Sequence, residues 1–273
     1  MIRFENVSVE YSTGQGDRIR ALNRIHLTLE EGEYVAVMGP NGSGKSTLAR
    51  LCNGLVLPSS GTVYVDEFHL TAEWTRHIPD IRRRVGMVFQ NPDNQLVSTT
   101  VEREVAFGLE NLGLPYEEMH ERVQKALQTF DLAHLRHRAP HQLSGGEKQR
   151  LALAAVMVMQ PRHLILDEPT ALLDFRHQQE FLLYLQQLRQ STTTPPTTVY
   201  ITHFAPEALL ASRLIVLHRG EVVLDGAPKE VFLQETRLNQ IGLYPPIEFS
   251  AYLRLRDKLP IKSVEDLFPQ PIL

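Results

Sequence analysis

The chain has 273 residues, of which 42% are hydrophobic and 22% charged; this is an ordinary composition for a globular protein and allows one large α/β domain with a small appendage. The formal net charge of −4 gives no reason to expect nucleic acid as a partner, and the single cysteine, Cys52, excludes an internal disulfide and fits a reducing cytosol. The longest apolar run, residues 151–159, is too short to span a bilayer, and we see no leader-like apolar stretch at the start, so we expect another polypeptide to supply any membrane channel.

Short strands are predicted in the first part of the chain. Residues 1–30 alternate apolar and polar side chains around a polar loop with Gly14 and Gly16, which is typical of an antiparallel pair. Residues 61–66 show strand character too and are expected in the same layer. These segments predict an antiparallel β subdomain.

The most informative segment, residues 39–46, reads Gly-Pro-Asn-Gly-Ser-Gly-Lys-Ser and is a phosphate-loop motif. It lies between a strand-like run, residues 33–38, and an amphipathic helix. The apolar face of that helix is formed by Leu48, Leu51, Cys52 and Leu55. Because glycines lack a Cβ, backbone N–H groups can close around an oxyanion at the helix N-terminus. Lys45 is expected to reach the β- and γ-phosphates, and Ser46 to offer its hydroxyl to Mg²⁺.

The middle of the chain is predicted to be mostly helical. Residues 84–89 read as a buried strand that ends at Gln90, and helices are expected over residues 91–160. One helix opens at Pro115 and places four apolar side chains on one face, namely Met119, Val123, Leu127 and Phe130.

Two carboxylates lie at the end of a strand-like run, residues 163–167. Asp167 ends this run and Glu168 comes directly after it. In a phosphate-loop enzyme, an aspartate at the end of a neighbouring strand holds Mg²⁺, and a second acid can polarise an attacking water. The alternative is that Glu168 simply begins the next helical turn before Pro169 and Thr170.

The remaining elements complete an alternation of strands and helices. A helix is expected around residues 175–190, a surface loop at 191–196, a strand at 198–202 and a hairpin at 215–224. Strands that alternate with helices predict a mainly parallel sheet covered on both faces. We place one domain at residues 1–227 and a small helical appendage at 228–273, where prolines break the pattern.

Several motifs together carry a family likeness. Residues 143–150, Leu-Ser-Gly-Gly-Glu-Lys-Gln-Arg, resemble the ABC ATPase signature, and residues 164–170 resemble its Walker B strand. Residues 171–174 are similar to the D-loop, Gln90 to the Q-loop glutamine and His203 to the switch histidine. The order and spacing agree over about residues 1–225. The resemblance implies a P-loop NTPase of ABC type: a mainly parallel α/β core, an antiparallel β subdomain, a helical subdomain at about 91–160 and the C-terminal helical appendage.

The resemblance also implies roles for single residues. Ser144, Gly145 and Gly146 open a helix, and in the family this end faces the γ-phosphate bound by the opposite subunit. Two chains would therefore enclose two ATP molecules, with Mg²⁺. Tyr11 lies where the family stacks a ring on adenine, although it is also an ordinary strand aromatic. His203 would contact the γ-phosphate, although taken alone it is more simply a surface histidine.

The candidate site is thus a defined set of residues. Catalysis is assigned to Glu168, His203 and Gln90, and Mg²⁺ to Ser46, Gln90 and Asp167. ATP contacts are assigned to Tyr11, Gly39, Asn41, Gly42, Ser43, Gly44, Lys45, Ser46, Thr47, Ser144, Gly145, Gly146 and Asp174. One departure is Glu147, where glutamine is commoner in the family; its negative charge near the partner's phosphates is expected to weaken closure modestly.

Within the family, residues 89–95 and 105–111 look like the energy-coupling factor ATPases, which power uptake of vitamins and of metals such as cobalt and nickel. This likeness implies a second ATPase subunit, either a copy or a related chain. It also implies an integral membrane T component whose coupling helices dock near Gln90–Gln95, in a groove lined by the residues just after Gln90. A substrate-binding S component would be contacted indirectly, and the chain would lie at the cytoplasmic face of the membrane. The alternative for Asn91–Gln95 is a plain polar turn.

Other functions are weighed against this one. A different ABC importer or an exporter remains open. A non-transport ABC ATPase usually carries a long coiled-coil insertion or two tandem nucleotide domains, and the chain has neither. A phosphate-loop kinase would lack the segment Leu143–Gly146. The sequence does not specify the solute, nor whether the ATPase pair is a homodimer or a heterodimer.

Overall fold

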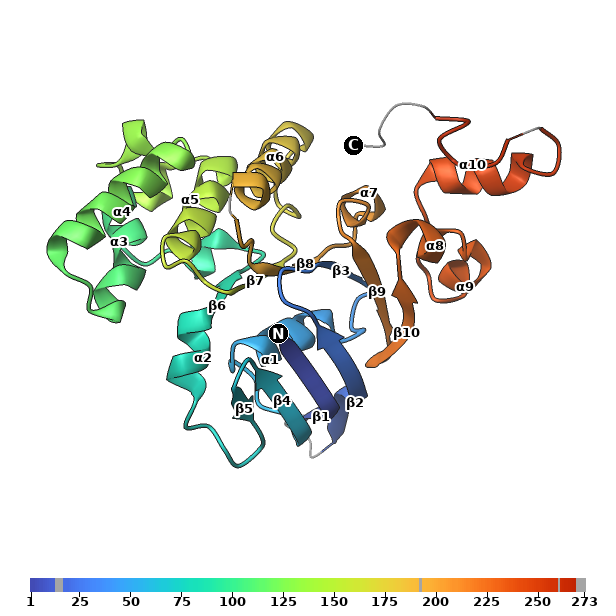
Figure 1. Ribbon diagram of the computed structural model, residues 1–273, viewed down its shortest axis with the longest axis horizontal. Coiled ribbons are helices and arrows are strands. Elements are labelled where there is room, and N and C mark those ends of the chain that lie inside the picture. Colours follow the sequence, from blue (N-terminus) through green and yellow to red (C-terminus); the bar gives the residue numbers. More distant parts are fainter. Residues whose placement is uncertain (13–16, 192, 260, 269–273) are drawn as a thin grey trace.

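The computed structural model describes residues 1–12, 17–191, 193–259 and 261–268, and these residues form two β-sheets with helices around them (Figure 1). The expected turn at Gly14 and Gly16 lies outside the described residues. Within the described ranges, no helix is both long and apolar enough to cross a bilayer.

The larger sheet has six strands, of which five run parallel and the edge strand β10 pairs antiparallel with β9. Its order is β10 (Glu221–Gly226), β9 (Arg213–His218), β3 (Tyr34–Met38), β8 (Thr197–Ile201), β7 (His163–Asp167) and β6 (Val85–Val88). The expected strands and the 215–224 hairpin are confirmed. The hairpin turns at Arg219 and Gly220, both at positive φ.

The smaller sheet is antiparallel and is expected from the sequence except for its last strand. Its order is β2 (Arg18–Leu29), β1 (Ile2–Ser12), β4 (Ser60–Val65) and β5 (Phe68–Leu70). Strand β5 is only three residues long, which is too short for a visible alternation.

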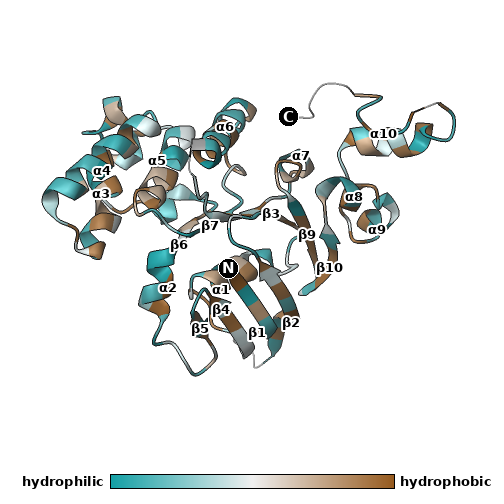
Figure 2. Ribbon diagram, viewed as in Figure 1, coloured by the Kyte–Doolittle hydropathy of each residue, from teal (hydrophilic) through white to brown (hydrophobic). Residues whose placement is uncertain are grey.

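The larger sheet separates two hydrophobic cores because successive side chains of a strand point to opposite faces. In β3, Ala36 and Met38 join the core under the helical part of the chain, whereas Val35 and Val37 join the core against the smaller sheet. In β7, Leu164 and Leu166 join the first core and Ile165 the second, so these strands have apolar side chains on both faces. Strand β9 of the same sheet is mostly brown, the colour of hydrophobic residues, in Figure 2.

Helix α1 (Lys45–Cys52) contacts strands of both sheets and lies in the second core. Leu55 was expected on its buried face, and this was wrong. The helix ends at Cys52, Gly54 takes a positive φ of 67°, and Leu55 is 45% exposed. A second short helix, α2 (Ile78–Arg84), was not expected; Arg84 closes it instead of opening a strand.

Residues 91–160 are mostly helical, as predicted, and appear in green at the left of Figure 1. The helices are α3 (Val101–Leu112), α4 (Tyr116–Thr129) and α5 (Gly145–Met157), with 3₁₀ turns at Pro92–Asn94, Ala133–Leu135 and Pro140–Gln142. Helix α6 (Phe175–Ser191) follows β7, and the short helix α7 (Ala205–Ala208) follows β8.

The C-terminal segment forms α8 (Pro228–Phe232), α9 (Glu235–Gln240) and α10 (Ile247–Leu255). Phe232 packs on Phe249 with ring centroids 5.5 Å apart, and both belong to the first core. The described part of the appendage is therefore helical, and its buried apolar side chains belong to the first core of the main domain. The boundary at 227/228 stays a prediction.

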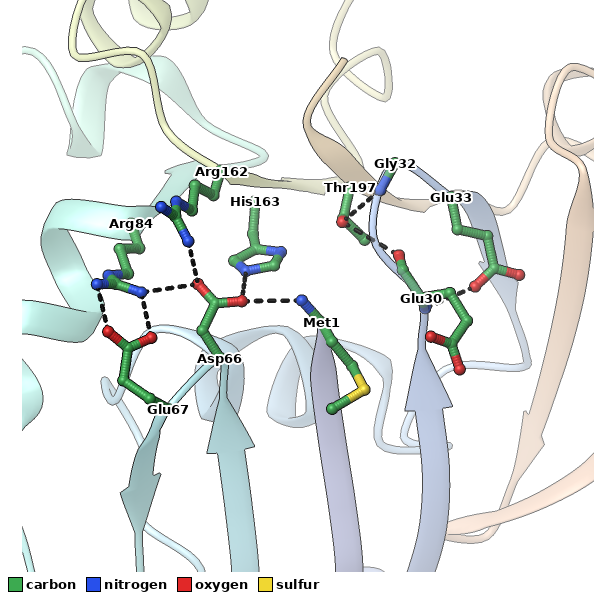
Figure 3. Close-up of polar contacts among 10 residues, drawn as sticks. All are labelled: Met1, Glu30, Gly32, Glu33, Asp66, Glu67, Arg84, Arg162, His163 and Thr197. Carbon is green, nitrogen blue, oxygen red and sulfur yellow. Dashed lines mark hydrogen bonds and ion pairs between the residues drawn. The ribbon is translucent and has the colours of Figure 1, made fainter. Parts of the chain in front are cut away.

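Ion pairs and hydrogen bonds join the loops at the amino-terminal edge of the larger sheet (Figure 3). The Asp66 carboxylate, 13% exposed, accepts from the amino group of Met1 at 2.8 Å and from Nε2 of His163 at 3.0 Å, and pairs with Arg84 at 3.2 Å. Burial acts to raise the pKa of Asp66, but the Met1 amino group and His163 outweigh it and hold that pKa at about 2. Burial lowers the pKa of His163, so its ring is neutral at pH 7 and donates from Nε2.

Candidate nucleotide site

Loops that follow four neighbouring parallel strands meet at the opposite, carboxyl edge of the larger sheet. The phosphate loop follows β3, Gln90 follows β6, Glu168 follows β7 and His203 follows β8. Because β3, β8, β7 and β6 are adjacent and parallel, their carboxyl ends bring these residues together. This is the edge at which open α/β sheets bind ligands.

Two glycines of the phosphate loop are required by its close packing. At Gly39, a Cβ would lie 2.3 Å from the carbonyl oxygen of Leu217 and 2.4 Å from Oγ of Ser43. Gly44 caps α1 with φ at +106°, and a Cβ there would lie 2.5 Å from the carbonyl oxygen of Ala21. The loop therefore passes close to other backbone and delivers the first turn of α1, with its free N–H groups, to the carboxyl edge.

Lys45 lies inside the phosphate loop and is almost fully buried. Its Nζ donates to the carbonyl oxygens of Gly39 at 2.9 Å and Pro40 at 3.3 Å. Burial lowers the pKa of Lys45, and the nearby carboxylates of Glu168 and Asp167 oppose that shift. The loop thus holds a cation on backbone carbonyls, where an anionic ligand can replace them.

Ser46 and Asp167 meet across the space between α1 and β7. Oγ of Ser46 donates to Oδ1 of Asp167 at 3.1 Å. Burial raises the pKa of Asp167, the Ser46 hydrogen bond opposes this, and the charge of Glu168 raises it further. A buried carboxylate next to a second acid is stabilised by a cation, and oxygen ligands of this type suit Mg²⁺.

Gln90, Glu168 and His203 form one contiguous set although they come from three loops. Nε2 of Gln90 donates to Oε2 of Glu168 at 3.1 Å, and Nε2 of His203 lies 2.8 Å from Oε1 of the same carboxylate. Glu168 takes a positive φ of 51°, and its N–H donates to the carbonyl oxygen of Ile201 in β8. Strained backbone of this kind is concentrated at functional positions.

Tyr11, at the end of β1, lies over the helix that follows the phosphate loop. Its hydroxyl is 3.3 Å from Oγ1 of Thr47, and its ring is partly exposed. The structure therefore places Tyr11 beside α1, where a ring can stack on a ligand held by the loop. Asn41 and Gly42 lie on the exposed side of the loop, and Ser43 is buried.

The signature segment begins α5 and stands apart from the phosphate loop. Ser144 is the N-cap of α5, and its Oγ accepts from the N–H of Glu147 at 3.3 Å. In the part of the chain that the structure describes, no hydrogen bond or ion pair joins Ser144, Gly145 or Gly146 to the phosphate loop. Asp174 is likewise engaged elsewhere, by the N–H and the ring of His177 at 3.0 and 2.8 Å.

Comparison with known proteins gives the family. The profile of the ABC transporter family matches residues 22–171, more than half of the chain. The chain is 45% identical over 246 residues to the energy-coupling factor transporter ATP-binding protein EcfA1 of Caldanaerobacter subterraneus subsp. tengcongensis, across 90% of this chain and 87% of the relative. The chain belongs to the ABC transporter family, in its energy-coupling factor branch.

Solved structures agree with this membership. The ABC ATPase is similar to cbiO1 from Clostridium perfringens, part of the ABC transporter complex cbiONQ, with a TM-score of 0.75, 35% identity and coverage of 94% of this chain and 98% of that one. It is also similar to the ATP-binding cassette MJ0796 in a dimeric post-hydrolysis state bound to ADP and Pi, with a TM-score of 0.75, 31% identity and coverage of 84% and 99%. The expected fold class is confirmed.

Sequence reasoning missed a buried residue that supports the site of this ABC ATPase. Glu207, in α7, is 2% exposed. It accepts from Oγ1 of Thr170, just after Glu168, at 2.7 Å, and from Oγ1 of Thr202, just before His203, at 2.5 Å. Burial raises the pKa of Glu207, and these hydrogen bonds oppose that rise. The sequence offered one signal for this contact: each of two predicted strands has a threonine at or shortly after its end, Thr202 and Thr170.

A second missed contact lies between helix α5 and the segment that directly follows Gln90. Nζ of Lys148 pairs with Oδ1 of Asp93 at 2.7 Å, and Nε2 of Gln95 donates to the carbonyl oxygen of Ala152 at 3.4 Å. Both Lys148 and Ala152 belong to α5. The Gln90–Gln95 segment of the ABC ATPase is therefore attached to the helix that the signature begins.

Proposed function

We propose that this ABC ATPase binds ATP with Mg²⁺ at the carboxyl edge of its larger sheet and completes its catalytic site by pairing with a second ATPase subunit. As an ATPase of the energy-coupling factor branch, it hydrolyses ATP to drive transport by a membrane complex. The observation that carries the proposal is the Gln90–Glu168–His203 set beside the phosphate loop and the Ser46–Asp167 pair.

The residues present fit both ligands. Lys45 and the first turn of α1 offer positive charge and N–H donors to a triphosphate. Asp167, Ser46 and Gln90 supply oxygen donors for Mg²⁺, and the raised pKa of Asp167, caused first by burial, indicates a carboxylate that gains from a nearby cation. When bound, Mg²⁺ would supply charge neutralisation on the phosphate oxygens.

The roles of the remaining residues follow from their positions. Glu168, held by Gln90 and His203, would orient and polarise the water that attacks the γ-phosphorus, with ADP leaving in line. His203 would then donate to the γ-phosphate, and the Lys45 ammonium would move from its backbone carbonyls to the β- and γ-phosphates. Positioning and charge stabilisation would supply most of the catalysis.

The separation of Ser144–Gly146 from the phosphate loop of the same chain supports a shared site. A helix N-terminus that does not reach its own nucleotide is available to the nucleotide of a second subunit. We propose that Ser144–Gly146 and Asp174 complete the site of that subunit. The exposed side chains of Tyr244 and Ile247 on the appendage would add contact in the pair.

We also propose that the segment Gln90–Gln95 docks an integral membrane T component, which in turn holds an S component for a vitamin or a transition metal ion. Its attachment to α5 supports this, because a partner bound there would act on the signature helix. Val97 and Phe107 nearby in sequence are exposed apolar side chains. The chain would then lie at the cytoplasmic face of the membrane.

The test combines nucleotide binding with recovery of partners. Tagged chain, expressed with its neighbouring membrane proteins, is purified from solubilised membranes with and without Mg·ATP. We expect an integral membrane protein and a second ATPase chain in the purified complex, with ATP hydrolysis. Recovery with ribosomes or nucleic acid and without any integral protein would refute the transport role, and absence of Mg·ATP binding would refute the site.

A further inference from the structure

The N-terminus of α5 is closed by a reciprocal pair of hydrogen bonds between Ser144 and Glu147. Oε2 of Glu147 accepts from the backbone N–H of Ser144 at 2.7 Å and from its hydroxyl at 2.8 Å. In return, Oγ of Ser144 accepts from the N–H of Glu147 at 3.3 Å. One carboxylate oxygen of Glu147 therefore accepts from both donors of Ser144.

Those two donors are among the groups at this helix end that a phosphate would use, together with the N–H groups of Gly145 and Gly146. A phosphoryl oxygen approaching the N-terminus of α5 from a second subunit would meet the Ser144 hydroxyl and N–H, and an anionic oxygen already occupies them. Glu147 is only partly buried, so solvent and an approaching subunit can both reach it.

We propose that the Glu147 carboxylate acts as an internal substitute for the γ-phosphate, which the nucleotide of the partner subunit must displace before the dimer closes. This inference rests on the proposed function. It assigns Glu147 as a positioning residue that sets how much ATP is needed for closure. The displacement is an exchange of one anion for another at the same donors, so closure gains less from Ser144 than it would at a free helix end.

A cationic side chain lies near the displaced carboxylate. Arg150 lies one turn further along α5; its Nη1 is 3.7 Å from Oε2 of Glu180, and its Nε is buried without a hydrogen-bond partner among the described residues. Hydrogen bonding from Ser144 is the main cause that lowers the pKa of Glu147, and the charges of Arg150 and Arg138 lower it further. A carboxylate that leaves Ser144 is therefore still attracted along the helix by the charge of Arg150.

The N-cap itself survives this exchange. The bond from the N–H of Glu147 to Oγ of Ser144 uses the oxygen as an acceptor, and the same hydroxyl can still donate its hydrogen to a phosphate. Only the carboxylate half of the reciprocal pair is replaced, so α5 keeps its first turn while the partner's nucleotide binds.

The experiment measures the ATP concentration at half-maximal association with the partner ATPase subunit, either a second copy or the related chain that copurifies. The parent protein carries Glu168→Gln, so that bound ATP persists. In this parent, Glu147→Gln removes the charge of the side chain and keeps a similar shape. The matched control is Glu110→Gln, which removes one charge at an exposed position of α3.

We expect Glu147→Gln to lower the half-maximal ATP concentration about three- to tenfold at low salt, and by less as salt is raised, because screening weakens the repulsion between carboxylate and triphosphate. The control variant, Glu110→Gln, should leave the half-maximal ATP concentration unchanged. If Glu147 only caps α5, Glu147→Gln would not change the half-maximal ATP concentration. Glu147→Ala would then lower the melting temperature and still leave that concentration unchanged. This pair of results would overturn the inference.

Failure of the inference is separable from failure of the proposed function. If the Glu168→Gln parent itself shows no ATP-dependent association, the shared nucleotide site is refuted and the role of Glu147 with it. If the parent associates with ATP and Glu147→Gln changes nothing, only the substitute role of Glu147 is refuted.

Discussion

The two edges of the larger sheet are built differently. At the amino edge, Asp66 is surrounded by the Met1 amino group, His163 and Arg84, so its charge is satisfied by the chain itself (Figure 3). At the carboxyl edge, the Lys45 ammonium donates to backbone carbonyls near the carboxylates of Glu168 and Asp167, and Asp167 lies beside that second acid. We expect the first arrangement to stabilise the fold, and the second to gain further partners when the proposed ligand binds.

The largest expected effect at the carboxyl edge is on the rate of hydrolysis. Glu168→Gln keeps an acceptor for the hydrogen bond from Gln90 and removes the carboxylate that would polarise water, so we expect turnover to fall by roughly two to three orders of magnitude with ATP binding retained. Phosphate release and nucleotide binding measured on the same complex check this. Near-normal turnover in the variant would remove Glu168 from the role of base.

Lys45→Ala is expected to weaken ATP binding roughly 10- to 100-fold, because it removes charge-assisted hydrogen bonds to phosphate. Calorimetric titration of Mg·ATP measures the affinity, and melting of the free protein confirms that the fold is intact. Lys125→Ala, on α4, is the matched loss of a lysine elsewhere. Equal affinities of the two variants would contradict the placement of phosphates at this loop.

At the amino edge the expected effect is reversed, with stability lost and ATP affinity kept. Asp66→Asn leaves the Met1 amino group and Arg84 with a neutral partner, and we expect the free energy of unfolding to fall by about 1–2 kcal/mol, since the site is partly screened by solvent. Urea unfolding and Mg·ATP titration are compared. Glu67→Gln, which removes the exposed partner of Arg84, serves as the control and should change stability little.

The same edge predicts a pH dependence of stability. The pKa of Asp66, about 2 in the folded chain against an ordinary 3.8, means that the unfolded chain binds more protons, so stability is lost as pH falls from about 4 toward 2. Burial also lowers the pKa of His163, which has the same sign and begins below about pH 6.5. Unfolding measured across this range should show the lower part of the loss diminished in Asp66→Asn; an identical profile would exclude Asp66 as its source.

The smallest expected effect concerns Tyr11. A ring that stacks on adenine contributes about 0.5–1.5 kcal/mol, so Tyr11→Ala should weaken ATP binding roughly two- to tenfold. Tyr11→Phe keeps the ring and loses only the contact to Thr47, so its affinity should stay near the original. If both variants bind like the parent, Tyr11 has a packing role.

Sequence and structure agree best where the determinants are local. The phosphate loop, the strand ending at Asp167 and the hairpin at Arg219 are each specified by a few adjacent residues, and they were predicted. Glu207 was missed because its role depends on two threonines that lie 37 and 5 residues away in sequence. Leu55 was misplaced because helical spacing alone cannot show that the chain turns at Gly54.

The ion pair between Asp93 and Lys148 has one more consequence. It joins the segment proposed to receive a membrane protein to the helix whose first residues are proposed to receive a nucleotide. Thermodynamic linkage makes any coupling between these two sites reciprocal. If bound nucleotide multiplies the affinity for the membrane protein by some factor, the bound membrane protein multiplies the affinity for nucleotide by the same factor. Docking of the membrane protein at residues 90–95 would thus raise the nucleotide occupancy of this ATPase at a fixed ATP concentration.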